Sequence, residues 1–463
     1  MTRPGAPPGL SRAGGRLPGA ATWAGNRDVL DNALALLGTA AVTSVLGLVY
    51  WAVATQLFSR EAVGYGSAAV SAMTLFGTIG MLGWGPMLIG ELPRRTGSRG
   101  GLVVVAVLAS GVASLVLGVG FAVVAPFMTD RFVHLTGSLP SAALFSVGAA
   151  LTGATLVFDQ ATVGVLRGGL QLWRNACFSV LKILALFLAA LVLHDRYGLG
   201  ITASWVTGTA LSLVPTVWLL RRSGTRPWHR PDWAGLRGLG RTTVAHSWLN
   251  LAVQLPRLLV PVLVTALVSA SANGAFYVVW MLVGVLYLVP THLSTALFAA
   301  TSGQPAAMAR KLRLTLRLFA VLGLVAMAVL AFGAAEVLSL FGDGYATAAT
   351  VPLQLLVLGY LPTIVKVHYL AVCRAEDHVT RAAVVLSAFA ALEIAGTVVG
   401  AQWSGLVGVC AALLACYVIE AVFTGLPVWR AARPRDGAHR REARSAPEVR
   451  VAGQGAELSQ RRR

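Results

Sequence analysis

The feature that most constrains the fold is a series of about twelve apolar stretches, each of roughly 20 residues. A helix of that length crosses the hydrocarbon core of a bilayer, because each residue adds about 1.5 Å. The chain is 56% hydrophobic and only 12% charged, which excludes an ordinary soluble domain. We therefore expect an all-α integral membrane protein with about 12 transmembrane helices. The expected spans are 33–57, 64–90, 101–128, 141–166, 175–193, 198–220, 244–267, 275–300, 314–334, 350–372, 382–401 and 405–428.

The basic residues predict the orientation of these spans. Of the 37 Lys and Arg residues, 31 fall in the two tails and in the loops on one side of the membrane. The loops on the other side hold only Arg60, Arg131 and Arg196. Cytoplasmic loops are the ones enriched in Lys and Arg, so both termini are expected in the cytoplasm. The same distribution accounts for the net charge of +19 without a nucleic-acid partner.

The two halves of the chain also resemble each other. SREAVGYG follows the first span and SASANGAFY follows the seventh, which places Gly64 and Gly274 at an offset of 210 residues. The same offset carries the starts of spans three to six to within three residues of the starts of spans nine to twelve. A duplication of six helices gives two lobes of the same orientation, related by an axis along the membrane normal, with a central cleft.

These patterns divide the chain into five expected parts. They are a disordered basic cytoplasmic tail (1–28), a first six-helix lobe (29–220), a cytoplasmic linker (221–243), a second six-helix lobe (244–430) and a disordered basic tail (431–463). The first 28 residues lack the apolar core and cleavage site of a signal peptide. The linker holds six arginines, which either are solvated or lie along the anionic inner leaflet.

Arg257 is the most unusual residue of the spans. It lies near the middle of 244–267, between Pro256 and Pro261. A charge at that depth costs at least about 2.5–3.5 kcal/mol, so the side chain should face protein, water or an anionic ligand. Two interpretations stay open: contact with a transported anionic head group, or structural pairing with a buried acid. Lys366 and Lys182 are the next candidates for substrate contact.

Two further ionisable residues lie inside the first half. Asp159 precedes Arg167 by eight residues, and Lys182 follows Arg174 by eight. Each therefore lies about 12 Å inside the cytoplasmic boundary, on consecutive antiparallel helices. We expect them to meet, either as a structural ion pair or as groups that bind substrate or a coupling proton.

The second half carries Glu393 and Glu420 together with Lys366. Glu393 lies one position from the repeat equivalent of Lys182, with the opposite charge. Either glutamate is a candidate counter-ion for Arg257, in a structural or a coupling role. The four cysteines have no metal-ligand spacing, and neither a nucleotide-binding loop nor a catalytic triad is visible. We expect no catalytic residues, no metal and no cofactor.

A family resemblance adds to these features. LFSREAVGYGSAAVSAMTLFGTIGMLGWGPMLIGELPRR, with GAFYVVWML, VPTHLSTALFAATSG, LSLFGDGYATAATVPLQLLVLG and WSGLVGVCAAL in the second half, resembles the polysaccharide flippases of the multidrug/oligosaccharidyl-lipid/polysaccharide (MOP) exporter superfamily. The likeness spans roughly residues 30–430 and depends on the order of the motifs. It implies a bacterial cytoplasmic-membrane protein that moves a polyprenyl-pyrophosphate-linked oligosaccharide outward by alternating access. The implied partners are the lipid-linked glycan, the bilayer and glycan polymerase or ligase proteins.

Three alternatives to a flippase follow from the same residues. An ion-coupled multidrug or cation antiporter of the same superfamily would use a deep acid such as Asp159 for its coupling ion. A major facilitator transporter is suggested by GELPRRTGSR, although Arg94 stands where that class has an acid. A membrane-embedded glycosyltransferase or polymerase is disfavoured by the short outer loops, so we expect a transporter and not an enzyme.

Overall fold

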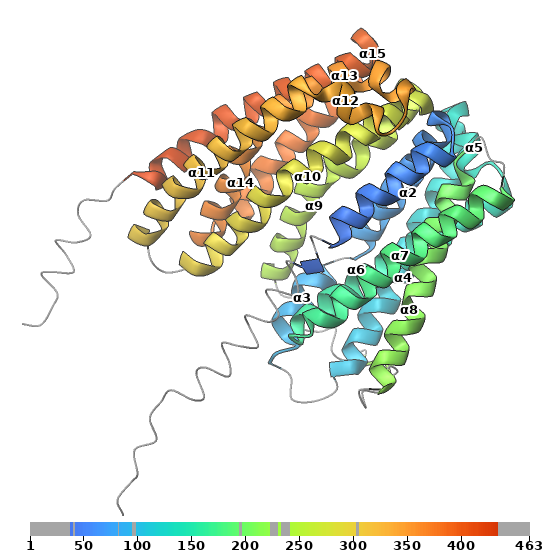
Figure 1. Cartoon of the computed structure of the whole chain (residues 1–463). Helices are drawn as coiled ribbons and strands as arrows, with labels where there is room; N and C mark the ends of the chain where they lie inside the picture. The colour runs from blue at the N-terminus through green and yellow to red at the C-terminus, as the bar shows by residue number, and fades with distance from the viewer. Residues whose placement is uncertain are drawn as a thin grey trace, which may run out of the picture. The chain divides into compact units, whose positions relative to one another are not determined.

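The computed structural model describes residues 38–39, 42–81, 83–94, 99–193, 197–222, 230–232, 241–301 and 305–433. Every regular element in these ranges is a helix (Figure 1). The expected tail 1–28, nearly all of the expected tail 431–463 and most of the linker lie outside the described residues. The structure divides into two compact units, Met1–Tyr277 and Val278–Arg463. The division expected at residues 221–243 therefore stays a prediction.

The described helices follow the hydropathy pattern closely. Before α2 lies the short apolar helix Val42–Leu57. The helices of the first half are α2 (Arg60–Gly80), α3 (Trp84–Glu91), α4 (Arg99–Met128), α5 (Val133–Thr136), α6 (Leu139–Gly164), α7 (Gly168–Val192) and α8 (Leu199–Arg222). Those that follow are α9 (Arg241–Leu267), α10 (Ala270–Thr301), α11 (Pro305–Phe332), α12 (Ala334–Ser339), α13 (Asp343–Leu358), α14 (Tyr360–Ala375) and α15 (Val379–Ala432).

Within the described residues, nine helices are long and apolar enough to cross a membrane, or ten when a bent pair is counted as one span. The chain is thus a multi-pass membrane protein. The bent pair is α13 and α14, which meet at 43°. The second expected span is also broken, between α2 and α3, where Gly83 adopts a positive φ of 85°. The 54-residue α15 contains non-helical Ser404 and Gly405, at the expected boundary between the last two spans. The expected count of 12 spans and the orientation stay predictions.

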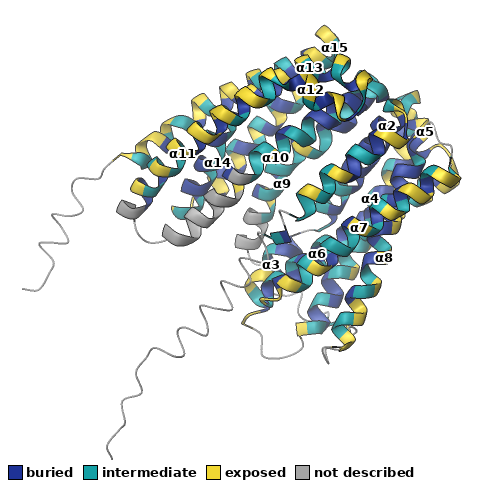
Figure 2. Ribbon diagram, viewed as in Figure 1, coloured by how far each residue is buried: buried dark blue, intermediate teal, exposed yellow. Residues whose placement is uncertain are grey.

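The first unit packs around α2. Its core is built from Tyr65, Met73 and Phe145 with their neighbours, where α2 lies against α6 and α8. Helices α4 and α6 pack together, as do α7 and α8. Most residues of α2 are buried, whereas α4 and α7 carry many exposed apolar residues (Figure 2). An exposed apolar face on a long helix is the surface that lipid would cover.

The two glycines of the repeat lie at one close helix crossing in this unit. A Cβ on Gly64 would collide with the carbonyl oxygen of Ala270, and one on Gly274 would collide with that of Arg60. Asn273 Nδ2 donates to the carbonyl oxygen of Gly64 at 2.8 Å, and Arg60 Nε donates to Ser271 Oγ at 2.8 Å. Small residues permit such approach of backbones inside a membrane. The segments around Gly64 and Gly274, which the sequence predicts to be equivalent, therefore pack against each other.

The second unit contains most of α10 and the helices α11 to α15. Helix α14 packs along α15, and α11 contacts α13, α14 and α15. Gly323 allows Tyr360 to lie directly on α11, where its hydroxyl donates to the carbonyl oxygen of Phe319 at 3.3 Å. Arg313 Nη1 donates to the carbonyl oxygen of Ala432 at 3.0 Å, so the start of α11 lies beside the end of α15. The start of α11 and the end of α15 therefore lie at the same end of this unit.

Candidate functional site

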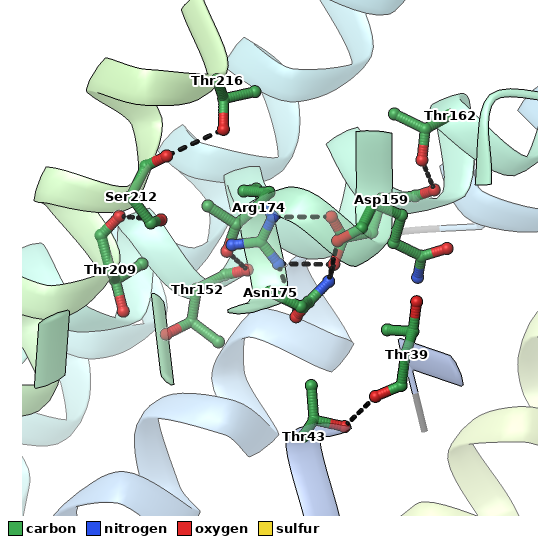
Figure 3. Close-up of polar contacts among 12 residues, drawn as sticks. Thr39, Thr43, Thr152, Asp159, Thr162, Arg174, Asn175, Thr209, Ser212 and Thr216 are labelled. Atoms are coloured by element: carbon green, nitrogen blue, oxygen red, sulfur yellow. Dashed lines mark hydrogen bonds and ion pairs between the residues drawn. The ribbon is translucent and has the colours of Figure 1, made fainter. Parts of the chain in front are cut away.

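Asp159 and Arg174 form a buried pair across the turn between α6 and α7 (Figure 3). Arg174 Nε donates to Oδ1 at 2.7 Å and Nη2 donates to Oδ2 at 2.5 Å. Asn175 Nδ2 donates to Oδ2 at 3.1 Å. The two charged side chains are only 6% and 11% exposed. Bidentate, charge-assisted bonds of this kind leave the carboxylate neutralised and fixed in direction.

This pair corrects the expected pairing of Asp159 with Lys182. The expected pairing assumes that Arg174 lies at the membrane boundary, but α7 already begins at Gly168. Asp159 lies five residues before the end of α6 and Arg174 six after the start of α7, so the two face each other across the hairpin. Nearby hydroxyls on α8, such as Ser212, donate to the backbone of their own helix (Figure 3).

Lys182 lies instead in an aromatic cage. Its ammonium is 4.8 Å from the ring centroid of Tyr50, 4.7 Å from that of Phe178 and 4.3 Å from that of Trp205. The residue is 3% exposed, and no described carboxylate forms an ion pair with it. Aromatic faces stabilise a desolvated cation by about 2 kcal/mol or more. The first unit therefore holds a buried basic group without an acidic partner in the described residues.

The cage depends on close packing between α7 and α8. A Cβ on Gly208 would lie 2.7 Å from the Cβ of Lys182, so only glycine lets α8 approach there. Tyr50 is held by a hydrogen bond of 2.8 Å between its hydroxyl and Ser204 Oγ. The cage is not predicted from the sequence, because its rings come from three helices. Only Phe178, one helical turn before Lys182, could have been found from spacing.

Arg257 lies on α9, which continues as a helix through Pro256 and Pro261. Pro256 is buried, whereas Arg257 is exposed on the surface of the structure. An exposed guanidinium near the middle of a membrane span requires water, protein or a ligand around it. Its expected contact with an anionic substrate stays a prediction.

Lys366, Glu393 and Glu420 form a charged cluster inside the second unit. Lys366 Nζ lies 3.1 Å from Glu393 Oε1 and 2.9 Å from Glu420 Oε2. The carboxylate side chains are 4% and 2% exposed, and that of Lys366 is 20% exposed. The second oxygen of Glu420, Oε1, is buried without a hydrogen-bond partner. Two carboxylates on one ammonium leave this cluster with an excess negative charge when all three are ionised.

The cluster ties three segments together. Lys366 lies on α14, while Glu393 and Glu420 lie on α15 before and after its non-helical residues Ser404 and Gly405. All three residues are candidates from the sequence, but one glutamate was expected to be the counter-ion of Arg257, whereas both contact Lys366. Among the described residues, no group of three or more His, Cys, Asp or Glu could hold a metal ion. The four cysteines are free thiols.

Comparisons with known proteins give the fold. No family model and no curated protein matches the sequence. A structure titled as the inward-facing conformation of a multidrug resistance MATE family transporter of the MOP superfamily matches at a TM-score of 0.66 and 13% identity, covering 86% of this chain and 98% of that one.

Two other solved structures agree. A MOP superfamily transporter from Pyrococcus furiosus, titled as having a binding pocket of reverse polarity, matches at a TM-score of 0.56 and 13% identity, over 88% of this chain and 96% of that one. The Vibrio cholerae MATE transporter VcmN matches at a TM-score of 0.57 and 12% identity, over 89% of this chain and 98% of that one. The chain has the fold of the MATE transporters of the MOP superfamily.

Proposed function

We propose that the protein is an ion-coupled antiporter that exports its cargo by alternating access. The fold supports this function, because proteins of similar structure are titled as transporters and one is titled as inward-facing. The observation that carries the proposal is the cluster of Lys366 with two buried carboxylates. An uncompensated charge in an apolar interior is costly, so the cluster favours uptake of one more positive charge.

The geometry of Glu420 supports a coupling role. Its Oε2 is bound by Lys366, while its Oε1 is buried and lacks a hydrogen-bond partner. A proton or Na⁺ that binds there in one conformation and not in the other shifts the balance between the two. Asp159, the coupling acid expected from the sequence, is held by Arg174 and Asn175 and is poorly suited to exchange a cation.

Multidrug or cation export is the first candidate for the cargo. The proteins of similar structure favour it over the flippase, because one of them is a multidrug resistance transporter. The major facilitator interpretation is not proposed, because the solved structures named above are MATE and MOP transporters.

The test uses the full chain in proteoliposomes loaded with ethidium. We expect ethidium efflux driven by an imposed proton or Na⁺ gradient, and the two gradients are applied separately to identify the ion. Glu420→Gln should abolish the response to the gradient. Glu336→Gln, which removes an exposed acid of the same unit, is the matched control and should retain it. Ethidium efflux that does not depend on either gradient would contradict the proposal. Gradient-driven efflux by the Glu420→Gln variant would also contradict it.

A lipid-linked oligosaccharide flippase is the second candidate, and the cations of the first unit favour it. Lys182 is buried without a described carboxylate, and Arg257 is exposed on a membrane-spanning helix. A guanidinium offers two parallel hydrogen bonds to a pyrophosphate. The implied partners would be glycan polymerase or ligase proteins of a bacterial cytoplasmic membrane.

This candidate is tested in a deletion strain with a membrane-impermeant label. Accumulation of lipid-linked glycan in the inner leaflet, reversed by the wild type and not by Arg257→Ala, would support it. Arg257→Lys should keep expression but lose much activity, since an ammonium lacks the planar fork. An unchanged leaflet distribution in the deletion strain, or full activity in Arg257→Ala, would rule out the role given to this arginine.

A further inference from the structure

A cavity of about 240 Å³ opens at one end of the second unit, where α14 ends and α15 both begins and ends. Arg381 and Arg430 line it from opposite ends of α15. Val372 and Pro427 give it an apolar wall. The turn at Asp377, with a positive φ of 57°, places the start of α15 beside the end of α14. Two guanidinium groups far apart in the sequence thus share one cavity.

The charges in this cavity are not balanced among the described residues. Glu376 lies 3.5 Å from His378, measured between Oε2 and Nδ1, and both line the cavity. Arg381 and Arg430 are exposed, and neither forms an ion pair with a described carboxylate. The cavity therefore carries excess positive charge next to an apolar wall, which suits an amphipathic anion.

The position of the cavity along the membrane normal follows from the distribution of Lys and Arg residues in the second unit. Eight of the nine described cations of the second unit lie at this end, and the ninth is Lys366. The opposite end has no described cation and carries Glu336 and Asp343. By the positive-inside rule this is the cytoplasmic end. The eight are Arg310, Lys311, Arg313, Arg317, Arg374, Arg381, Arg430 and Arg433.

An aromatic side chain marks the depth of the cavity. Trp429, next to Arg430, is 52% exposed, and the guanidinium of Arg433 lies 3.5 Å from its ring centroid. Exposed tryptophan paired with arginine is typical of the level of lipid head groups. The cytoplasmic leaflet is also where anionic lipids concentrate.

We propose that this cavity binds the phosphate of an anionic phospholipid of the inner leaflet. Arg381 and Arg430 contact the phosphate oxygens, because the planar guanidinium matches phosphate geometry. The acyl chains pass along the wall that contains Val372 and Pro427. The bound lipid bridges the two ends of α15 beside the end of α14 and stabilises the second unit. This site is independent of the cargo and of the Lys366 cluster.

The experiment measures binding of phosphatidylglycerol to the full chain in neutral detergent micelles by native mass spectrometry. The test variant is Arg381→Gln with Arg430→Gln. The control is Arg310→Gln with Arg317→Gln, which removes the same charge from exposed positions outside the cavity. Two lost arginine contacts should weaken the affinity about thirtyfold. The control should stay within about twofold of the wild type if binding is local.

Further arms separate the possible outcomes. Retention of one phosphatidylglycerol per chain in the wild type and the control, with loss in the test variant, supports the site. Equal loss in both variants means a diffuse attraction to the basic face and overturns the proposal. Competition by millimolar inorganic phosphate, with no preference for phosphatidylglycerol over phosphate, would make the ligand a free phosphate and would also overturn the lipid assignment. Phosphatidylcholine, which has no net charge, should not bind with measurable stoichiometry.

Discussion

Removing Arg174 should destabilise the first unit strongly. In Arg174→Met, the carboxylate of Asp159 keeps only the Asn175 amide, although its side chain is 89% buried in the wild type. Breaking a buried pair by removal of one partner costs about 3–5 kcal/mol, because the remaining charge is left without compensation. The free energy of unfolding is measured by titration with sodium dodecyl sulfate in mixed micelles, followed by tryptophan fluorescence.

The double variant Asp159→Leu with Arg174→Met completes the cycle. Replacement of a whole buried pair by apolar side chains of similar size is often neutral or stabilising, so the double variant should unfold within about 1 kcal/mol of the wild type. With the single variant Asp159→Leu as the fourth protein, the cycle should give a coupling energy of about 3 kcal/mol or more between the two side chains. An Arg174→Met chain within about 1 kcal/mol of the wild type, or a double variant no more stable than the single one, would refute the structural role of the pair.

Three further predictions use the same titration. Gly64→Val should lower the free energy of unfolding by about 1–3 kcal/mol, because the new side chain collides with a carbonyl oxygen of α10. Gly90→Ala, which has open space around the new methyl group, should be neutral or slightly stabilising. Lys182→Met should stay within about 2 kcal/mol of the wild type, since it exchanges a cation–aromatic contact for apolar packing; a larger loss would indicate an additional partner for the ammonium. Lys366→Met should lower the free energy of unfolding by about 3 kcal/mol or more, because it leaves two buried carboxylates together. Adding Glu420→Gln should recover part of that loss, and equal stability of the single and double variants would count against the cluster.

Much of the fold could be predicted because hydropathy alone specifies where a chain can cross a bilayer. The expected spans from the second to the twelfth each overlap a described helix or a pair of helices, and the boundary expected between the last two spans falls at Ser404 of α15. Spans end where polar residues begin, and that information is local in the sequence. The offset between Gly64 and Gly274 likewise indicated two equivalent positions, and the structure shows the close backbone crossing that each glycine permits.

The partners of the buried charges could be predicted less well. The partner of Asp159 depends on where α7 begins, and an error of two turns moved Arg174 from the interior to the boundary. The aromatic cage of Lys182 depends on side chains from three helices, and the spacing of one helix carries no information on the others. The sequence identified the three residues of the Lys366 cluster, but it did not predict that both glutamates contact Lys366. Element type is a local property, whereas ion pairing depends on tertiary packing.

The opposite charges at one pair of equivalent positions in the expected repeat have a consequence for how two such halves can be combined. Lys182 and Glu393 lie within one residue of equivalent repeat positions, one caged by aromatic rings and the other bound to Lys366. A dimer of two identical first halves would bury two ammonium groups at these positions, and a dimer of two second halves would bury two carboxylates. The single chain instead places one basic and one acidic group at these two positions, so the two halves offer opposite charges where two copies of one half would offer like charges.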